Sequence, residues 1–230
     1  MAHMPVTERR TRLLSAAFEV IARSGVSGAT TRAIVDEADM KLASFHYAFE
    51  SREDLLAQLV DVVVDTQEVV LGIPADTAGG LRELLERGLL SYFDQVRANP
   101  LHERAMFELT QYALRTPSMA GVAERQYGRY RALAEASLRE AAARTGCAWQ
   151  TPVPELAADL VALTDGITLA WLADGDDERA HRTIAFAARA LAAEATPDPS
   201  PRPHFPRNKP LPGADSDVSA NEHAETMETS

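Results

Sequence analysis

The chain has few of the residues on which enzymes and metal proteins depend. Its 230 residues include a single cysteine, Cys147, which excludes an internal disulfide and a cysteine-rich metal cluster and fits a reducing cytoplasm. It has no glycine-rich phosphate loop and no Gly-x-Ser-x-Gly turn. Its one His-Glu pair, His102-Glu103, lacks the second histidine of a zinc hydrolase. We therefore expect no catalytic residues, no metal and no cofactor.

Long apolar runs are also missing. The opening MAHMPVTERR contains no apolar segment, so we expect no signal peptide, and MAHM is typical of a cloning remnant. The most apolar stretch, residues 156–173, is interrupted by Asp159 and Asp165. It is predicted to be a core helix instead of a membrane span. We expect a cytoplasmic protein without membrane contact.

Alternating strand patterns are absent as well. Apolar residues recur three and four positions apart, which is the spacing of helices with one buried face. This pattern predicts an all-α fold of about nine helices. The predicted helices cover residues 7–24, 30–38, 41–49, 51–71, 81–98, 101–115, 118–145, 154–173 and 176–195.

The end of the chain differs in composition. Residues 196–230 are rich in Pro, Ser, Asp and Glu and contain scarcely an apolar residue. Such a segment cannot bury enough surface to offset the entropy lost on ordering. We predict a disordered tail.

Residues 30–49, TTRAIVDEADMKLASFHYAF, are predicted to form two short helices around a tight turn. Thr30 or Thr31 can cap the first helix through its hydroxyl, and the turn falls at Asp39. The expected apolar anchors of the second helix are Ala43, Phe45 and Phe49. A helix-turn-helix can place its second helix in the major groove of DNA, although many all-α proteins without this function contain two helices and a turn.

Residues 7–64 as a whole resemble the DNA-binding domain of the tetracycline-repressor (TetR) family. The residues that carry the resemblance are Ala16, Ala17, Phe18, Gly25, Thr30, Thr31, Ile34, Ala38, Phe45, Tyr47, Phe49, Ser51, Arg52, Glu53, Leu55 and Leu56. The resemblance implies a DNA-binding domain over residues 7–64, with its helix-turn-helix at residues 30–49. It also implies an α-helical effector-binding and dimerisation domain over residues 65–195.

The function that the resemblance implies is transcriptional regulation by a homodimer. The expected protein is a repressor that a small-molecule effector releases from a pseudo-palindromic operator in double-stranded DNA. The chain departs from the family pattern at Asp39, where a turn glycine is usual, and at Lys41, where a capping serine or asparagine is frequent. The alternative is therefore an all-α ligand-binding or protein-interaction module with an impaired DNA-binding head. An α-helical enzyme is the least favoured reading.

The side chains expected at DNA surround the second helix of the helix-turn-helix. Lys41 and Arg52 are predicted to bind phosphates, and Ser44 and His46 to read base edges. The full predicted set is Thr31, Arg32, Lys41, Leu42, Ser44, His46, Tyr47 and Arg52.

The net charge of −11 is unusual for a DNA-binding protein, but its distribution permits this function. Residues 1–60 hold seven of the 23 Lys and Arg residues and eight of the 34 Asp and Glu residues, so this part is nearly neutral. DNA responds to the local field more than to the total charge. The residues expected to form a basic rim are Arg9, Arg10, Arg12, Arg32, Lys41 and Arg52.

Aromatic and polar side chains gather on the helices predicted between residues 81 and 173. Core packing explains many of them, but this mixture also suits a largely apolar pocket with a few orienting groups. The predicted effector-binding residues are Phe93, Met106, Phe107, Thr110, Gln111, Tyr127, Tyr130, Thr168 and Trp171.

Two further helix faces have predicted roles. The helix at residues 51–71 is expected to pack on the DNA-binding head through Leu55, Leu59 and Val62, and so to link it to the body. The last two helices carry small residues that permit a close approach between two subunits. These residues are Ala157, Ala158, Ala187, Ala188 and Ala192.

Overall fold

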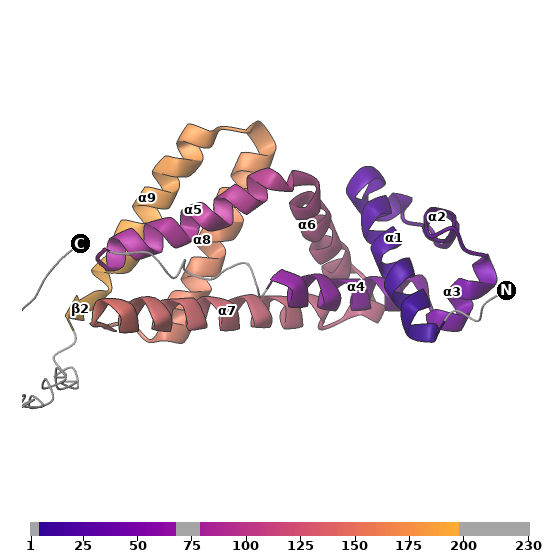
Figure 1. The fold of residues 1–230 in the computed structure, drawn as a ribbon, viewed down its shortest axis with the longest axis horizontal. Coiled ribbons are helices and arrows are strands. Elements are labelled where there is room, and N and C mark those ends of the chain that lie inside the picture. The colour runs from indigo at the N-terminus through magenta and orange to yellow at the C-terminus, as the bar shows by residue number, and fades with distance from the viewer. Residues whose placement is uncertain (1–4, 68–78, 198–230) are drawn as a thin grey trace, which may run out of the picture. The chain divides into compact units, whose positions relative to one another are not determined.

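The computed structural model describes residues 5–67 and 79–197. Within these residues the chain forms nine α-helices (Figure 1), so the all-α prediction is confirmed. The helices of the N-terminal part are α1 (Val6–Gly28), α2 (Thr31–Glu37), α3 (Leu42–Ala48) and α4 (Arg52–Gln67). The elements that follow are α5 (Leu81–Ala98), α6 (Pro100–Arg115), the 3-10 helix η1 (Pro117–Met119), α7 (Val122–Thr145), β1 (Cys147–Trp149), α8 (Val153–Asp174), α9 (Asp177–Ala193) and β2 (Ala195–Pro197).

The helix-turn-helix forms where the sequence predicts it. The Thr30 hydroxyl accepts a hydrogen bond from the Ala33 N–H at 3.1 Å and so caps α2. Asp39 lies in the turn with φ of 52°, a left-handed conformation that aspartate tolerates better than most residues. Lys41 precedes α3 without a side-chain capping bond. The departures at Asp39 and Lys41 therefore leave both helices and the turn intact.

The first helix is interrupted at Gly25, which the sequence predicts as its C-terminal cap. Gly25 has φ of 72°, while the residues up to Gly28 resume helical hydrogen bonding. A Cβ at Gly25 would lie 2.8 Å from the Glu108 carboxylate. Both the backbone conformation and the close approach of α6 therefore require glycine here.

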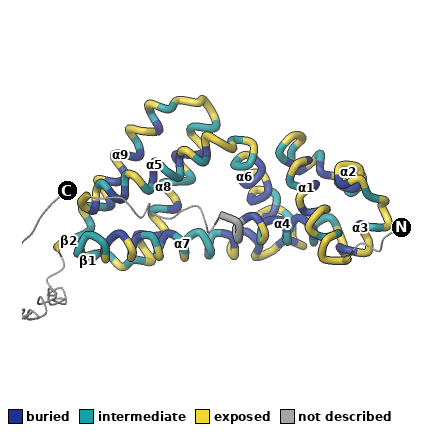
Figure 2. Tube along the Cα trace, in the orientation of Figure 1, coloured by how far each residue is buried: buried dark blue, intermediate teal, exposed yellow. Residues whose placement is uncertain are grey.

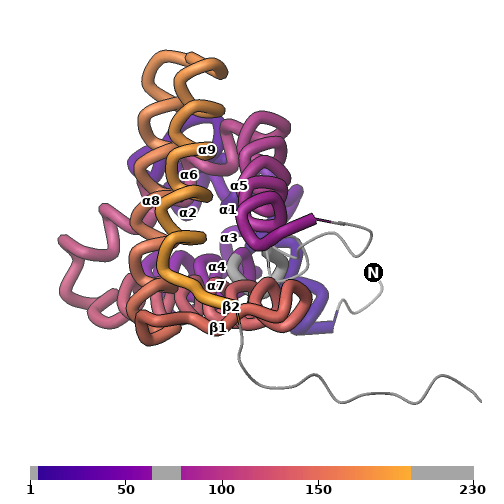
Figure 3. Tube along the Cα trace, turned by 90° about the vertical axis from the view of Figure 1, so that its left-hand side faces the viewer, coloured from indigo at the N-terminus to yellow at the C-terminus, as the bar shows by residue number. Residues whose placement is uncertain are grey.

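Two buried cores hold the helices together (Figure 2). The first core joins α1 to α4 with the apolar face of α6, including Met106 and Leu109, and with the start of α7 at Val122. The second joins α5, α7, α8 and α9 around Phe93 and Leu138. Helices α8 and α9 lie side by side, and α5 packs on α9 (Figure 3). Because α6 shares the first core with α1 to α4, a movement of α6 would change the packing of the N-terminal helices.

Two predicted helix faces are corrected. Ala43, an expected anchor of α3, is exposed, and Ala48 is buried beside Phe45. Val62, expected to pack inward from α4, is 45% exposed, while Leu56 is fully buried. In both helices the actual contact stripe depends on where neighbouring helices cross, which spacing within one helix does not specify.

A small antiparallel sheet is an element that the sequence analysis missed. Strand β1 pairs with β2, with Cys147 opposite Pro197 and Trp149 opposite Ala195. The prediction that the disordered tail begins at residue 196 is therefore wrong for Thr196 and Pro197, which belong to β2. Residues 198–230, the rest of that prediction, lie outside the described residues.

The position of β2 changes what truncation should do. Removing residues from 195 onward deletes β2 and its backbone hydrogen bonds with β1, and we expect it to cost about 1–2 kcal/mol and to lower the melting temperature by roughly 2–8 °C. The matched truncation after Pro197 keeps the sheet and removes only the polar tail, so we expect the melting temperature of the full chain. Equal melting temperatures for the two truncations, measured by circular dichroism, would contradict this role of β2.

Candidate functional site

Helix α3 presents one exposed face. Lys41, Leu42, His46 and Tyr47 are exposed, Tyr47 by 78%, and Ser44 is half-buried. The opposite face is held by the buried Phe45, and the centre of its ring lies 5.7 Å from the centre of the Phe49 ring. On α2, Arg32 is exposed and Thr31 half-buried. Each of these seven predicted DNA-binding residues is therefore exposed or half-buried, and their contacts with DNA stay predictions.

Three arginines of α1 hold α3 and the turn in place. The guanidinium carbon of Arg9 lies 5.6 Å from the centre of the Tyr47 ring, and that of Arg10 lies 5.1 Å from the Phe49 ring. Arg12 donates a hydrogen bond to the Ala38 carbonyl at 2.9 Å, at the end of α2. These three arginines, which belong to the predicted basic rim, therefore also position α3, the second helix of the helix-turn-helix.

Arg52 does not belong to the DNA surface. Its Nε donates to the Ala29 carbonyl at 2.6 Å, and its Nη2 donates to the Val26 carbonyl. Its Nη1 donates to the Tyr112 hydroxyl at 2.9 Å and lies 3.3 Å from Glu53. The prediction that Arg52 binds a DNA phosphate is wrong, because all three guanidinium nitrogens are engaged within the chain.

Helix α6 makes a second connection to the end of α1. The Glu108 carboxylate accepts a hydrogen bond from the Val26 N–H at 2.7 Å, and the Tyr112 hydroxyl donates to Glu53 at 3.1 Å. Glu108, Tyr112 and Arg52 thus join α6 and α4 to the last turn of α1 and to Ala29. The contacts of Glu108 and Tyr112 were not predicted, since each joins residues far apart in the chain.

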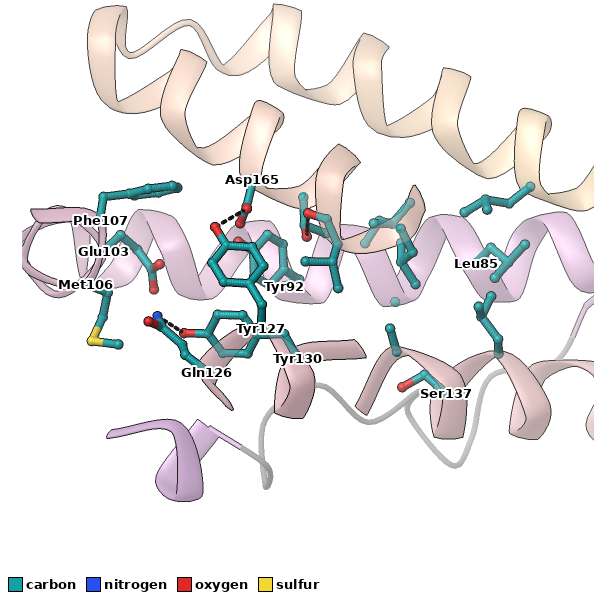
Figure 4. Close-up of a pocket in the computed structure, with 18 of the residues that line it drawn as sticks. Leu85, Tyr92, Glu103, Met106, Phe107, Gln126, Tyr127, Tyr130, Ser137 and Asp165 are labelled. Carbon is teal, nitrogen blue, oxygen red and sulfur yellow. Dashed lines mark hydrogen bonds between the residues drawn. The ribbon is translucent and has the colours of Figure 1, made fainter. Parts of the chain in front are cut away.

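A cavity of about 130 Å³ lies among α5, α6, α7 and α8, with one side chain from α9 (Figure 4). Its wall is largely apolar, with Leu85 of α5 at one end and Phe107 and Met106 of α6 at the other. The polar residues in this wall are Tyr92, Glu103, Thr110, Gln126, Tyr127, Tyr130, Ser137, Thr164 and Asp165. This composition is typical of a ligand pocket.

Hydrogen bonds orient several of these polar groups. The Tyr127 hydroxyl donates to the Asp165 carboxylate at 2.6 Å (Figure 4). The Gln126 amide donates to the Tyr130 hydroxyl at 3.1 Å, and its carbonyl accepts from the Thr110 hydroxyl at 3.0 Å. The rings of Tyr127 and Tyr130 meet edge to face, with centres 5.7 Å apart. One wall of the cavity is therefore held by two sets of hydrogen bonds, which the contact between the Tyr127 and Tyr130 rings joins.

Burial changes the acidity of the cavity residues. It raises the pKa of Glu103 to about 7, and the negative charge of Asp165 adds to this shift. It also raises the pKa of Asp165, against the opposing effect of the hydrogen bond from Tyr127. The pKa of Tyr130 rises to about 12, and burial likewise raises the pKa of Tyr92 and Tyr127. The tyrosines therefore keep their protons at neutral pH.

Five of the nine predicted effector residues line this cavity: Met106, Phe107, Thr110, Tyr127 and Tyr130. Four do not. Gln111 is exposed. Phe93 is fully buried and packs edge to face on Trp171, whose indole donates to Asp177. Thr168 is buried behind the wall, where its hydroxyl lies 2.7 Å from that of Tyr92. The placement of these four residues in the pocket is therefore corrected.

The two acidic residues of the cavity wall, Glu103 and Asp165, were not predicted from the sequence. Glu103 shares one face of α6 with Met106, Phe107 and Thr110, at helical spacing, so that face could have indicated it. Asp165 interrupts the most apolar stretch of the chain, which is a second signal. Among the described residues, no three His, Cys, Asp or Glu side chains converge as a metal site requires.

Two family models match the chain. Residues 13–59 match the model described as bacterial regulatory proteins, tetR family, and residues 81–196 match the one described as BetI-type transcriptional repressor, C-terminal. The chain is also 30% identical over 180 residues to the HTH-type nicotine-responsive transcriptional repressor HdnoR of Paenarthrobacter nicotinovorans. That match covers 77% of this chain and 90% of HdnoR.

Solved structures have the same fold. A transcriptional regulator from Rhodococcus sp. Rha1 matches with a TM-score of 0.66 at 21% identity, over 84% of this chain and 99% of that one. The multidrug binding protein EbrR, in complex with ethidium, matches with a TM-score of 0.58 at 28% identity, over 78% and 98% of the two chains.

The helix-turn-helix, the helical body and these matches define a ligand-responsive DNA-binding regulator. The chain belongs to the TetR family of bacterial transcriptional regulators.

The position of Arg52 leads to a test by a charge-conserving change. Lysine cannot reproduce three directed guanidinium hydrogen bonds, so we expect Arg52→Lys to lower the free energy of unfolding by about 1.5–3 kcal/mol. The melting temperature should fall by roughly 3–12 °C. The control Arg32→Lys, at an exposed position of α2, should change stability by less than about 0.5 kcal/mol. If urea unfolding of Arg52→Lys matched the unmodified protein, Arg52 would not have this structural role.

Proposed function

We propose that the protein is a homodimeric transcriptional repressor that leaves a pseudo-palindromic operator when a small molecule fills the cavity. The observation that carries this proposal is the double role of α6. One face of α6 lines the cavity through Glu103 and Phe107, and the same helix contacts the DNA-binding head through Glu108 and Tyr112. A ligand that displaces α6 would therefore change how the head is held.

Helix α7 supplies a second connection. It lines the cavity through Gln126, Tyr127 and Tyr130, and its Arg129 donates a hydrogen bond to the Asp61 carbonyl of α4 at 3.0 Å. Helix α4 leads directly from the helix-turn-helix, so movement of α7 would tilt it. A ligand acts in this way only through different affinities for the two states. A coupling of ~1–3 kcal/mol corresponds to a change in DNA affinity of roughly 5- to 150-fold.

Similarity to known regulators supports a small organic effector. HdnoR is described as nicotine-responsive and EbrR was solved with ethidium, and the cavity of this chain lies in the region that matches a repressor C-terminal domain. We assign the cavity residues to ligand binding and give none of them a catalytic role. We also place the protein in the cytoplasm, where its DNA lies.

An exposed apolar face on α8 and α9 supports the dimer. It includes Leu169 and Phe186, each 58% exposed, and the exposed Ala158. Of the small residues predicted to mediate dimerisation, Ala157, Ala187 and Ala188 are instead buried in the chain's own core. The close approach between subunits is therefore assigned to the outer positions, which are Ala158, Ala162, Gly166, Leu169, Ala170, Phe186 and Ala190.

The apolar character of α8 would also suit a helix that crosses a membrane. Within the described residues α8 is the one helix long and apolar enough to cross a membrane by length and composition, and only 28% of its most apolar stretch is buried in the chain. Asp159 and Asp165 interrupt that stretch, and Asp165 faces the cavity. A dimer of two α8–α9 pairs would cover the exposed face, and we favour this arrangement.

The experiment that tests DNA binding uses DNA flanking the protein's own gene. We propose that Lys41 binds a phosphate while Ser44 and His46 read bases. Lys41→Ala should then weaken binding to all sequences and flatten the plot of log affinity against log salt by about 0.9 per lost contact, or about 1.8 per dimer. The control Arg87→Ala removes an exposed charge from α5 and should leave the slope unchanged. An unchanged slope for Lys41→Ala, measured by fluorescence anisotropy, would contradict its placement.

If α9 lies in the dimer interface, a charged substitution at Phe186 should disrupt the dimer. A charge in the proposed interface would be buried without a partner, so we expect Phe186→Glu to convert a dimer into a monomer. The change should also weaken operator binding, because two reading helices about 34–36 Å apart are then no longer linked. Leu114→Glu, at a 65% exposed leucine of α6, is the control and should stay dimeric. Sedimentation of the unmodified protein as a monomer at micromolar concentration would contradict the proposal.

A further inference from the structure

The charges that line the cavity are all of one sign. Glu103 from α6 and Asp165 from α8 both contribute to its wall, and among the described residues that line it there is no lysine, arginine or histidine. Figure 4 shows both carboxylates directed toward the space around the Tyr127 ring. Two carboxylates in an apolar cavity repel each other and lose hydration. The cavity is therefore complementary to a positive charge.

The two carboxylates differ in their hydrogen-bond partners. Asp165 accepts the hydrogen bond of the Tyr127 hydroxyl at 2.6 Å. For Glu103, no side-chain hydrogen bond or ion pair is formed with any of the described residues. Glu103 is half-buried, and an acidic group shielded from water without a partner costs stability. A ligand that supplies a cationic nitrogen would remove this cost.

The walls around the carboxylates are aromatic. Tyr92, Phe107, Tyr127 and Tyr130 come from three different helices and line the same cavity. The faces of aromatic rings attract cations, most strongly where water is excluded. The volume of about 130 Å³ is close to the ~150 Å³ of an engineered cavity that holds benzene. Both the walls and the size suit a small ring system.

We propose that the effector is an organic cation, with a protonated or quaternary nitrogen on a small aromatic or apolar body, and that its nitrogen binds between Glu103 and Asp165. The tyrosine and phenylalanine rings surround the body of the ligand. This inference rests on the proposed function, because it identifies the chemical class of the molecule that the repressor senses.

Proton release provides a signature of this binding mode. With a pKa near 7, Glu103 is partly protonated at neutral pH in the empty cavity, and a cation favours its ionised form. Binding should therefore tighten as the pH rises from about 6 to about 8. The other titratable groups that face Glu103 are Asp165 from α8, Tyr92 from α5, and Tyr127 and Tyr130 from α7. The tyrosines stay protonated over this range, and loss of the Asp165 proton acts in the same direction.

The test measures binding to the full chain without DNA, by isothermal titration calorimetry. The probes are benzylammonium, benzyl alcohol and benzoate, which share one ring and differ in charge, and phenyltrimethylammonium, whose charge does not titrate. We expect the two cations to bind at least about tenfold more tightly than benzyl alcohol, and benzoate more weakly still. Affinity for phenyltrimethylammonium should rise with pH. Benzyl alcohol or benzoate binding as tightly as the cations would overturn the proposal.

Variants separate the charge effect from folding. Glu103→Gln should lose about tenfold in affinity for phenyltrimethylammonium, together with most of the pH dependence, and keep its affinity for benzyl alcohol. The control Glu155→Gln removes the same charge from an exposed position of α8 and should behave like the unmodified protein. A melting temperature of Glu103→Gln equal to or above the original shows that it folds. If Glu103→Gln retained the full preference for cations, the inference would be wrong.

The outcome is independent of the repressor function. Cation binding that leaves operator affinity unchanged would support this inference and contradict the release of DNA by the ligand. Release of the operator by a neutral or anionic molecule, with no preference for cations, would support the repressor and overturn the cation site.

Discussion

The partly buried guanidinium of Arg52 makes the polar contact on which the placement of the helix-turn-helix depends. It binds the Val26 carbonyl in the last turn of α1, the Ala29 carbonyl between α1 and α2, and the Tyr112 hydroxyl of α6. Charged hydrogen bonds of this kind are stronger and more directional than neutral ones. The reading helix is in turn packed on α1 and α2. We propose that a displacement of α6 would be transmitted to α3 through these contacts.

Helix α6 also lines the cavity, where acidic side chains lie among apolar ones. Most of its wall is apolar, yet it contains Glu103 and Asp165, whose pKa values are raised by burial and, for Glu103, by repulsion. Such a site is less favourable empty than filled with a complementary ligand. Glu103 lies about one turn from Phe107 and Glu108 on α6. Under the proposed mechanism, a ligand that binds Glu103 would therefore act on the helix that contacts the DNA-binding domain.

Local features of the molecule could be predicted from the sequence, and features that depend on distant contacts could not. The cap at Thr30 and the left-handed turn at Asp39 follow from residues within a few positions of each other, and both are observed. Arg52 was assigned to DNA because the resemblance to the TetR family implies a phosphate-binding basic residue at the start of this helix, whereas its partners Ala29 and Tyr112 are 23 and 60 positions away. Five residues of the cavity were predicted from the aromatic and polar content of the helices. Glu103 was not predicted, because its sequence neighbours do not show that α8 packs near it. Strand β2 was missed for the same reason, since its partner β1 is remote in the chain.

Thermodynamic linkage tests directly whether the cavity and the DNA-binding domain are coupled. The affinity of the tightest-binding organic cation is measured by calorimetry on the free protein and on the protein saturated with its operator. Binding free energies are reciprocal, so a ligand that weakens DNA binding must itself bind the complex more weakly by the same factor. The account predicts a loss of affinity of roughly 5- to 150-fold in the presence of operator. Equal affinities with and without operator would contradict it.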